Sequence, residues 1–187
     1  MIYVTSDLHL CHDREFLYKP RGFENVSDMN EFIVNAWNEK IDVDDTVYVL
    51  GDLVLGGDKG TECGIKMLSS LNGDIHVILG NHDTDNRVAR YRELLNISSI
   101  QYADMLQYNG YRFFMTHYPC YTSNLTKETM KQCVLNLHGH LHSKKKFYED
   151  IPYMYNVCMD AHGCKPVSID TIIEDIKNKI IECKNEL

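Results

Sequence analysis

Residues 75–83 read IHVILGNHD and residues 46–52 read TVYVLGD, and these two stretches decide the fold. Each begins with a run of mostly apolar and β-branched side chains, 75–79 in the first and 46–50 in the second, which predicts a short buried strand. Each run stops at a glycine, Gly80 or Gly51, and the positions that follow are polar. The two stretches therefore predict strands whose carboxyl ends carry polar side chains.

Outward from these stretches, helices alternate with further strands. Apolar residues at helical spacing predict helices at 28–38, capped by Ser27, and at 61–71, 88–95 and 169–184. Strands are predicted at 2–5, 100–108, 112–116 and 134–137, with Asn109-Gly110 as a hairpin turn into 111–116. Alternating strands and helices in the first half predict a parallel sheet, and the second half is rich in strands. The fold class is therefore α/β, with mixed sheets flanked by helices.

The composition excludes several classes of protein. The chain has 187 residues, with 19 Lys and Arg against 27 Asp and Glu, so its net charge is −8. We expect one domain over residues 1–187, and an acidic balance that argues against binding long duplex nucleic acid. No apolar run reaches the roughly 20 residues of a membrane-spanning helix, and no basic leader precedes the first strand, so we expect no membrane partner and a cytoplasmic location. Seven cysteines without a C-x-x-C pair argue against a zinc ribbon or disulfide framework.

Five of the predicted strands are followed by side chains that bind metal ions or transfer protons. In chain order these are Asp7 and His9; Asp52; Asn81, His82 and Asp83; His117; and His140 and His142. Because ligands bind at the carboxyl ends of the strands in α/β sheets, we expect these groups to meet at one edge. Each motif alone is common in turns and helix caps, but their repetition at five strand ends favours a functional site.

Taken together, Asp-x-His, Gly-Asp, Gly-Asn-His-Asp, His and Gly-His-x-His resemble the calcineurin-like metallophosphoesterase family, in its small prokaryotic and phage-type branch. The resemblance runs from Asp7 to His142. It implies a four-layer α-β-β-α sandwich with two mixed β-sheets and a binuclear metal centre. The metal ligands that it implies are Asp7, His9 and His142 for one ion, Asn81, His117 and His140 for the other, and Asp52 as the bridge.

This donor set of imidazole, carboxylate and amide oxygen suits two divalent ions, for which Mn²⁺ is our expectation and Fe²⁺, Ni²⁺, Co²⁺ and Zn²⁺ are alternatives. Ions about 3.5–4 Å apart can acidify a shared water to hydroxide. Two ions carry +4, while Asp7, Asp52 and the hydroxide carry −3, which leaves about +1 for a phosphate. We therefore expect a metal-dependent phosphatase or phosphodiesterase that attacks phosphomonoesters or phosphodiesters, small or nucleotide-like, with the metal-bridging hydroxide.

The family pattern makes His82 a catalytic residue that faces the substrate and donates a proton to the leaving oxygen. Asp83 is expected to orient the His82 ring and to raise its pKa, as a carboxylate partner does. His12 and Arg21 follow the first motif and are candidates for contacting the substrate phosphate. For His12, a loop histidine that is hydrogen-bonded locally is an equally ordinary interpretation, and for Arg21 a solvated loop cation is the default interpretation.

Two alternatives remain open at the sequence level. One is hydrolysis of a phosphoanhydride, as in a dinucleoside polyphosphate, and the other is a non-catalytic scaffold of the same fold. The segment after Gly51-Asp52 lacks the arginine of the phosphoprotein phosphatases, which argues against a dedicated Ser/Thr phosphatase. The retained His82 argues against the scaffold. The sequence does not identify the substrate or the oligomeric state.

Overall fold

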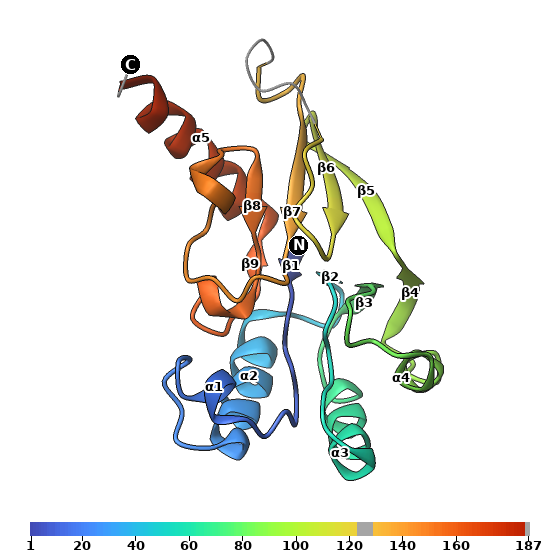
Figure 1. Cartoon of the computed structure of the whole chain (residues 1–187). Coiled ribbons are helices and arrows are strands. Elements are labelled where there is room, and N and C mark those ends of the chain that lie inside the picture. The colour runs from blue at the N-terminus through green and yellow to red at the C-terminus, as the bar shows by residue number, and fades with distance from the viewer. Residues whose placement is uncertain (123–128, 186–187) are drawn as a thin grey trace.

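The computed structural model describes residues 1–122 and 129–185, which form two mixed β-sheets with helices packed against them (Figure 1). The first sheet has the order β4-β3-β2-β1-β9. Its strands are β1 (Ile2–Thr5), β2 (Thr46–Val49), β3 (Asp74–Ile78), β4 (Ile97–Gln101) and β9 (Val167–Ser168). All neighbours pair in parallel except β9, which runs antiparallel to β1. The parallel sheet predicted for the first half is confirmed.

The second sheet has the order β5-β6-β7-β8. Its strands are β5 (Ala103–Tyr108), β6 (Tyr111–Thr116), β7 (Val134–His138) and β8 (Met154–Asn156). Only β5 pairs antiparallel, through the predicted hairpin to β6. Asn109 and Gly110 have φ of 49° and 80°, and two positive values are what a two-residue hairpin turn with the twist of the strands requires.

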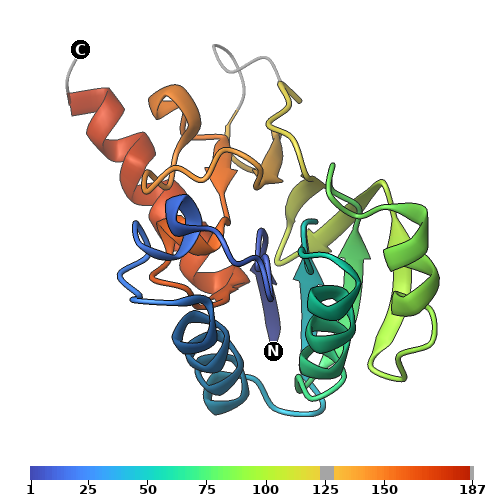
Figure 2. The same ribbon diagram turned by 60° about the horizontal axis from the view of Figure 1, so that its bottom comes forward.

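Alternate residues along β1 point into two different hydrophobic cores. Tyr3 belongs to the core between the first sheet and α2 (Val26–Lys40), α3 (Asp58–Leu68) and α4 (Asp85–Tyr91). Val4 belongs to the core between the two sheets, to which α5 (Ile169–Asn185) contributes its isoleucine stripe. Figure 2 shows α2, α3 and α4 in front of the first sheet, with α5 at the other side. The layered α/β architecture is therefore confirmed.

Three expectations about the elements need correction. The predicted strand 100–108 is two strands in different sheets, because the chain bends at Tyr102 and β4 and β5 pair with different partners. Asn25, not Ser27, caps α2 by accepting a hydrogen bond from the Asp28 backbone N–H. Helix α3 begins and ends three residues earlier than predicted, and α4 begins three residues and ends four residues earlier than predicted.

The remaining described helices are short: α1 (Glu15–Tyr18) and two 3₁₀ turns, Tyr148–Asp150 and Met159–Ala161. Among the described residues, every helix is too short or too polar to cross a bilayer.

Candidate metal centre

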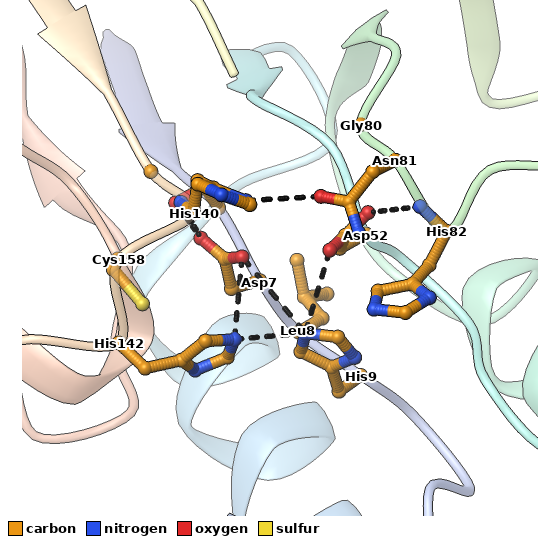
Figure 3. A network of polar contacts seen from close by, with 12 residues as sticks. Asp7, Leu8, His9, Asp52, Gly80, Asn81, His82, His140, His142 and Cys158 are labelled. Atoms are coloured by element: carbon orange, nitrogen blue, oxygen red, sulfur yellow. Dashed lines mark hydrogen bonds and ion pairs between the residues drawn. The ribbon is translucent and has the colours of Figure 1, made fainter. Parts of the chain in front are cut away.

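The polar groups that follow the strands of both sheets converge on one spot (Figure 3). Asp7 and His9 follow β1, and Asp52 follows β2. Asn81 follows β3, His117 follows β6, and His140 and His142 follow β7. Because β1, β2 and β3 are parallel neighbours, and β6 and β7 are parallel in the sheet packed against them, their carboxyl ends meet at a common edge. The structure thus brings together all seven residues that the sequence marked as metal ligands.

The first group of donors consists of Asp7, His9 and His142. The two Nε2 atoms of His9 and His142 lie 3.1 Å apart. Asp7 Oδ1 lies 3.8 Å from His9 Nε2 and 3.6 Å from His142 Nε2. These three atoms therefore surround one small volume, as the ligands of a single ion would.

The second group consists of Asn81, His117 and His140. His117 Nε2 lies 2.9 Å from Asn81 Oδ1 and 3.1 Å from His140 Nδ1, and His140 Nδ1 lies 2.9 Å from Asn81 Oδ1. This triangle is tighter than that of the first group, and within it Asn81 is exposed and His140 half-buried.

Asp52 lies between the two groups. Its Oδ2 atom is 3.6 Å from His9 Nε2 in the first group and 3.6 Å from His117 Nε2 in the second. Its Oδ1 atom accepts a hydrogen bond from the His82 backbone N–H at 2.8 Å, which fixes the orientation of the carboxylate. The Oδ2 atom is thereby held between the two groups, in the position that a ligand shared by two ions must occupy.

These donors fit divalent cations, because in the absence of cations the lone pairs of neighbouring donor atoms face one another. His117 Nδ1 contacts the Leu50 carbonyl oxygen at 2.7 Å, and since a carbonyl can only accept, Nδ1 carries the proton of the neutral ring. Nε2 then offers a lone pair toward Asn81 Oδ1, which is also an acceptor. In the first group, Asp7 Oδ1 is buried without a hydrogen-bond partner among the described residues. A cation in each group would satisfy these atoms.

Burial explains the protonation states in the centre. Desolvation, with the neighbouring charges of His142 and Arg21, lowers the pKa of His9 to about 2, so its ring is neutral and able to act as a ligand. Burial raises the pKa of Asp52, which reflects the cost of keeping a carboxylate away from water. A divalent cation would offset that cost.

The backbone of the centre is strained at most of the candidate ligands. Five of the seven candidate ligands have left-handed φ values of 49–72°. They are Asp7, His9, Asp52, His140 and His142. Such conformations cost roughly 1–3 kcal/mol each for residues other than glycine, and they are concentrated at functional sites. Two non-ligand positions permit close approach, since a Cβ on Gly80 would collide with the Asp52 carboxylate and one on Gly139 with that of Asp7.

The expected role of Asp83 needs correction. Its buried carboxylate accepts hydrogen bonds from the backbone N–H groups of Asp52, Leu53 and Gly80 and from the Tyr91 hydroxyl, at 2.8–3.3 Å. These four donors occupy both oxygens, so the carboxylate ties the end of β2 to the end of β3 instead of orienting the His82 ring. Asp83 is part of the support of the centre.

Arg21 also differs from expectation. Its side chain is 1% exposed, and the guanidinium donates to both carboxylate oxygens of Asp160 and to the backbone oxygens of Asp7 and Leu8. A buried and fully engaged side chain cannot steer a substrate, so the substrate-binding expectation for Arg21 is wrong.

Asp160 is the residue of the centre that the sequence reasoning missed. Burial alone would raise the pKa of Asp160, but hydrogen bonds from His142 and Arg21 outweigh burial and hold that pKa well below its usual value. A sequence signal did exist, because Asp160 follows β8 just as the ligands follow their strands. Its arginine partner lies 139 positions away, and no local pattern reveals such a pair.

A cavity of about 560 Å³ opens directly over the centre. His82 and His12 line it together with candidate ligands, and an apolar wall is formed by Phe16, Leu17, Pro20 and Leu55. The Phe16 side chain is 73% exposed, and its ring stands edge-on to that of His12 at 5.7 Å between centroids. His12 is half-buried, and burial, with His82 and Arg14 nearby, lowers its pKa to about 4. Both His82 and His12 are therefore placed where a substrate can reach them.

Comparisons with known proteins bear on the family and the fold of this chain. Residues 1–162 match the family model of the calcineurin-like phosphoesterases. An uncharacterized protein of Methanocaldococcus jannaschii is 32% identical over 100% of this chain and 97% of its own. The symmetrical bis(5′-nucleosyl)-tetraphosphatase of Histophilus somni is 46% identical over 43% of this chain and 23% of its own. The crystal structure of a protein of unknown function from Aquifex aeolicus shares the fold, with a TM-score of 0.71 and 22% identity over 93% of this chain and 98% of its own.

Proposed function

This chain belongs to the calcineurin-like phosphoesterase family, whose members hydrolyse phosphoesters with divalent metal ions, and from that membership we propose that it is a phosphodiesterase or phosphatase for small or nucleotide-like substrates. The observation that carries the proposal is the position of Asp52 Oδ2, 3.6 Å from one histidine of each donor group. A shared carboxylate oxygen between two sets of imidazole and oxygen donors is an arrangement suited to a two-metal hydrolase.

We propose that two divalent ions, with Mn²⁺ the expected pair, are held by the residues of the two groups. Asp7, His9 and His142 would hold one ion and Asn81, His117 and His140 the other, with Asp52 shared. When bound, the ions supply a nucleophile at neutral pH by acidifying water and neutralise the charge of the phosphate oxygens. The protein side chains fix the spacing of the ions and exclude other ligands on the buried side, where Asp7, His9 and His117 are at most 2% exposed.

His82 is the proposed proton donor to the leaving oxygen. It is exposed on the cavity side, and its ring lies 5.6 Å from that of His9 between centroids. Its backbone N–H is bonded to Asp52, so the residue is fixed to the centre while its ring stays free for substrate. Proton transfer from a positioned imidazole contributes about 100- to 10,000-fold to such reactions.

The cavity favours a phosphate that carries an organic group. Its volume of about 560 Å³ is in the range of roughly 300–1,000 Å³ found for small-molecule sites. A phosphate bound at the donor groups would leave the wall of Phe16, Leu17, Pro20 and Leu55 free for the rest of the substrate. An aryl or nucleoside group suits that wall, because an exposed aromatic ring offers it a stacking face.

A second candidate function is hydrolysis of a phosphoanhydride in a dinucleoside polyphosphate. The observation that favours it is the 46% identity, over 43% of this chain, to a symmetrical bis(5′-nucleosyl)-tetraphosphatase. The donor groups alone do not separate the two chemistries, since both require attack on a metal-bound phosphoryl group.

The test is a substrate panel with Mn²⁺, Ni²⁺ and Zn²⁺ supplied separately to metal-free protein. Bis-p-nitrophenyl phosphate, p-nitrophenyl phosphate and diadenosine tetraphosphate represent the diester, the monoester and the anhydride. We expect metal-dependent hydrolysis of the diester or the monoester at rates above that of the tetraphosphate. A preference for the tetraphosphate would select the second candidate, and failure to hydrolyse any of the three while metal is bound would contradict both.

A further inference from the structure

A buried ion pair that the proposed reaction does not use lies behind one half of the metal centre. Arg21 Nε and Nη2 donate to Asp160 Oδ1 and Oδ2 at 3.2 and 2.7 Å, and the two side chains are 1% and 6% exposed. An ion pair so well buried requires further hydrogen bonds to compensate for its desolvation. Both partners find those bonds at residues of the candidate metal centre.

On the carboxylate side, the partner is His142. Asp160 Oδ2 lies 3.0 Å from His142 Nδ1 and also accepts from the Cys158 thiol at 3.1 Å. An ionised carboxylate can only accept, so the proton of the neutral His142 ring is on Nδ1. Nε2 then keeps its lone pair, and it faces His9 and Asp7 as Figure 3 shows. Asp160 thereby selects the tautomer in which His142 can bind a metal.

On the guanidinium side, the partners are two backbone carbonyls of the first motif. Arg21 Nη2 donates to the Asp7 oxygen at 2.8 Å, and Nη1 lies 3.2 Å from the Leu8 oxygen. These carbonyls stand between Asp7 and His9, whose φ values of 57° and 50° are strained. Arg21 therefore holds the turn that aims both side chains into the centre.

The other donor group is supported differently. His117 is oriented by the Leu50 carbonyl, and the end of β3 is held by Asp83. Within the described residues, the contacts of Arg21 and Asp160 reach Asp7, Leu8, Met29, His142 and Cys158, and none of the second group. The ion pair thus contacts the first donor group and not the second.

We propose that Arg21 and Asp160 are positioning residues that set the metal affinity of the Asp7–His9–His142 group alone. The inference rests on the proposed two-metal function. It makes the centre asymmetric, with one ion whose binding depends on a charge pair outside the ligand set. Removal of such a supporting partner lowers metal affinity by about 10- to 100-fold in other metalloproteins.

The experiment is a calorimetric titration of metal-free protein with Mn²⁺, with metal content measured after dialysis. For Asp160→Asn we expect one ion to bind as in the unsubstituted protein and the other about 10- to 100-fold more weakly. Arg21→Lys keeps the charge but loses the two-pronged contact, and we expect a smaller loss at the same ion. The matched control is Asp175→Asn on α5, which removes an ion pair with Lys146 away from the centre and leaves an amide oxygen for the Tyr155 hydroxyl. It should leave both affinities unchanged.

If Asp160→Asn bound both ions with the affinities of the unsubstituted protein, the inference would be overturned. It would also be overturned if the affinities for the two ions fell by the same factor. If Asp160→Asn does not fold, because a buried Arg21 is left unpaired, the double substitution Arg21→Gln with Asp160→Asn removes both charges and is titrated in its place. For this double variant we also expect a lower affinity for one of the two ions. Failure of the unsubstituted protein to bind two ions would overturn the proposed function and the inference with it.

Discussion

The two donor groups use similar side chains but are supported by different means. The first, Asp7, His9 and His142, rests on the buried Arg21–Asp160 ion pair. The second, Asn81, His117 and His140, rests on the Leu50 carbonyl and on the backbone bonds of Asp83. A neutral carbonyl and a charge pair both fix an imidazole tautomer, yet only the charge pair adds a negative group behind the ligand. Equivalent ligands therefore need not give equivalent ions.

The largest effect is expected at Asp52, which lies between the two donor groups. Asp52→Ala removes the carboxylate that lies between the two groups, and we expect loss of both ions and a fall in kcat/KM of about 1,000-fold, corresponding to several kcal/mol of lost charge stabilisation. Kinetics on bis-p-nitrophenyl phosphate and metal analysis of the same sample measure it. The control is Asp44→Ala, an exposed carboxylate in the turn before β2, which should behave as the unsubstituted protein. Retention of both ions by Asp52→Ala would contradict the bridging role.

Removal of His82 should leave both donor groups intact. For His82→Ala we expect kcat to fall about 100- to 10,000-fold, because a positioned proton donor is lost, while two ions still bind. An aryl leaving group of low pKa needs less protonation than an alkyl one, so the fall should be smaller for p-nitrophenyl esters. Turnover close to that of the unsubstituted protein on alkyl esters would remove His82 from the reaction.

A substitution at Asp83 tests the support of the second donor group without altering the Arg21–Asp160 pair. Asp83→Asn keeps the shape but replaces an acceptor oxygen by an N–H donor that faces backbone N–H groups. We expect the metal-free protein to lose about 1–3 kcal/mol of unfolding free energy in urea, since buried donors lose their partner. We also expect the second group to bind its ion more weakly.

Tyr91→Phe removes only one of the four bonds to Asp83 and should cost about 1 kcal/mol. A change in urea stability for Tyr91→Phe as large as that for Asp83→Asn would show that the backbone bonds of Asp83 contribute little.

The smallest effect is expected outside both groups, at the cavity wall. Phe16→Ala should raise KM for bis-p-nitrophenyl phosphate about 5-fold and leave kcat nearly unchanged, because one aromatic contact of about 1 kcal/mol is lost. KM for methyl phosphate should not change. The control is Phe32→Ala on α2, which is 38% exposed and lies outside this cavity. An equal rise for both substrates would refute a role of Phe16 in holding the organic group.

The positions of the candidate ligands could be predicted from the sequence better than the residues that support them, and the reason is physical. Each ligand follows an apolar strand, and strand periodicity is local, so Asp52 or Asn81 can be placed at a sheet edge from its neighbours alone. The Arg21–Asp160 pair joins distant segments through loops, where no periodicity exists. The role predicted for Asp83 was wrong for a related reason. A carboxylate that follows a histidine in the sequence can accept hydrogen bonds from backbone N–H groups at the end of another strand. The strand 100–108 was misread because an exposed Tyr102 gave no sign that the chain changes sheets.

At the candidate ligand positions, the left-handed backbone conformation lowers the stability of the fold while the side chains are needed for the proposed activity. A glycine at Asp7, His140 or His142 would relax the local conformation, since glycine reaches positive φ without steric cost. Each such change would also delete a donor. Stabilising this protein by relieving backbone strain, a common engineering route, would therefore remove the candidate metal ligands first, and thermostable variants are better sought in α2, α3 and α5.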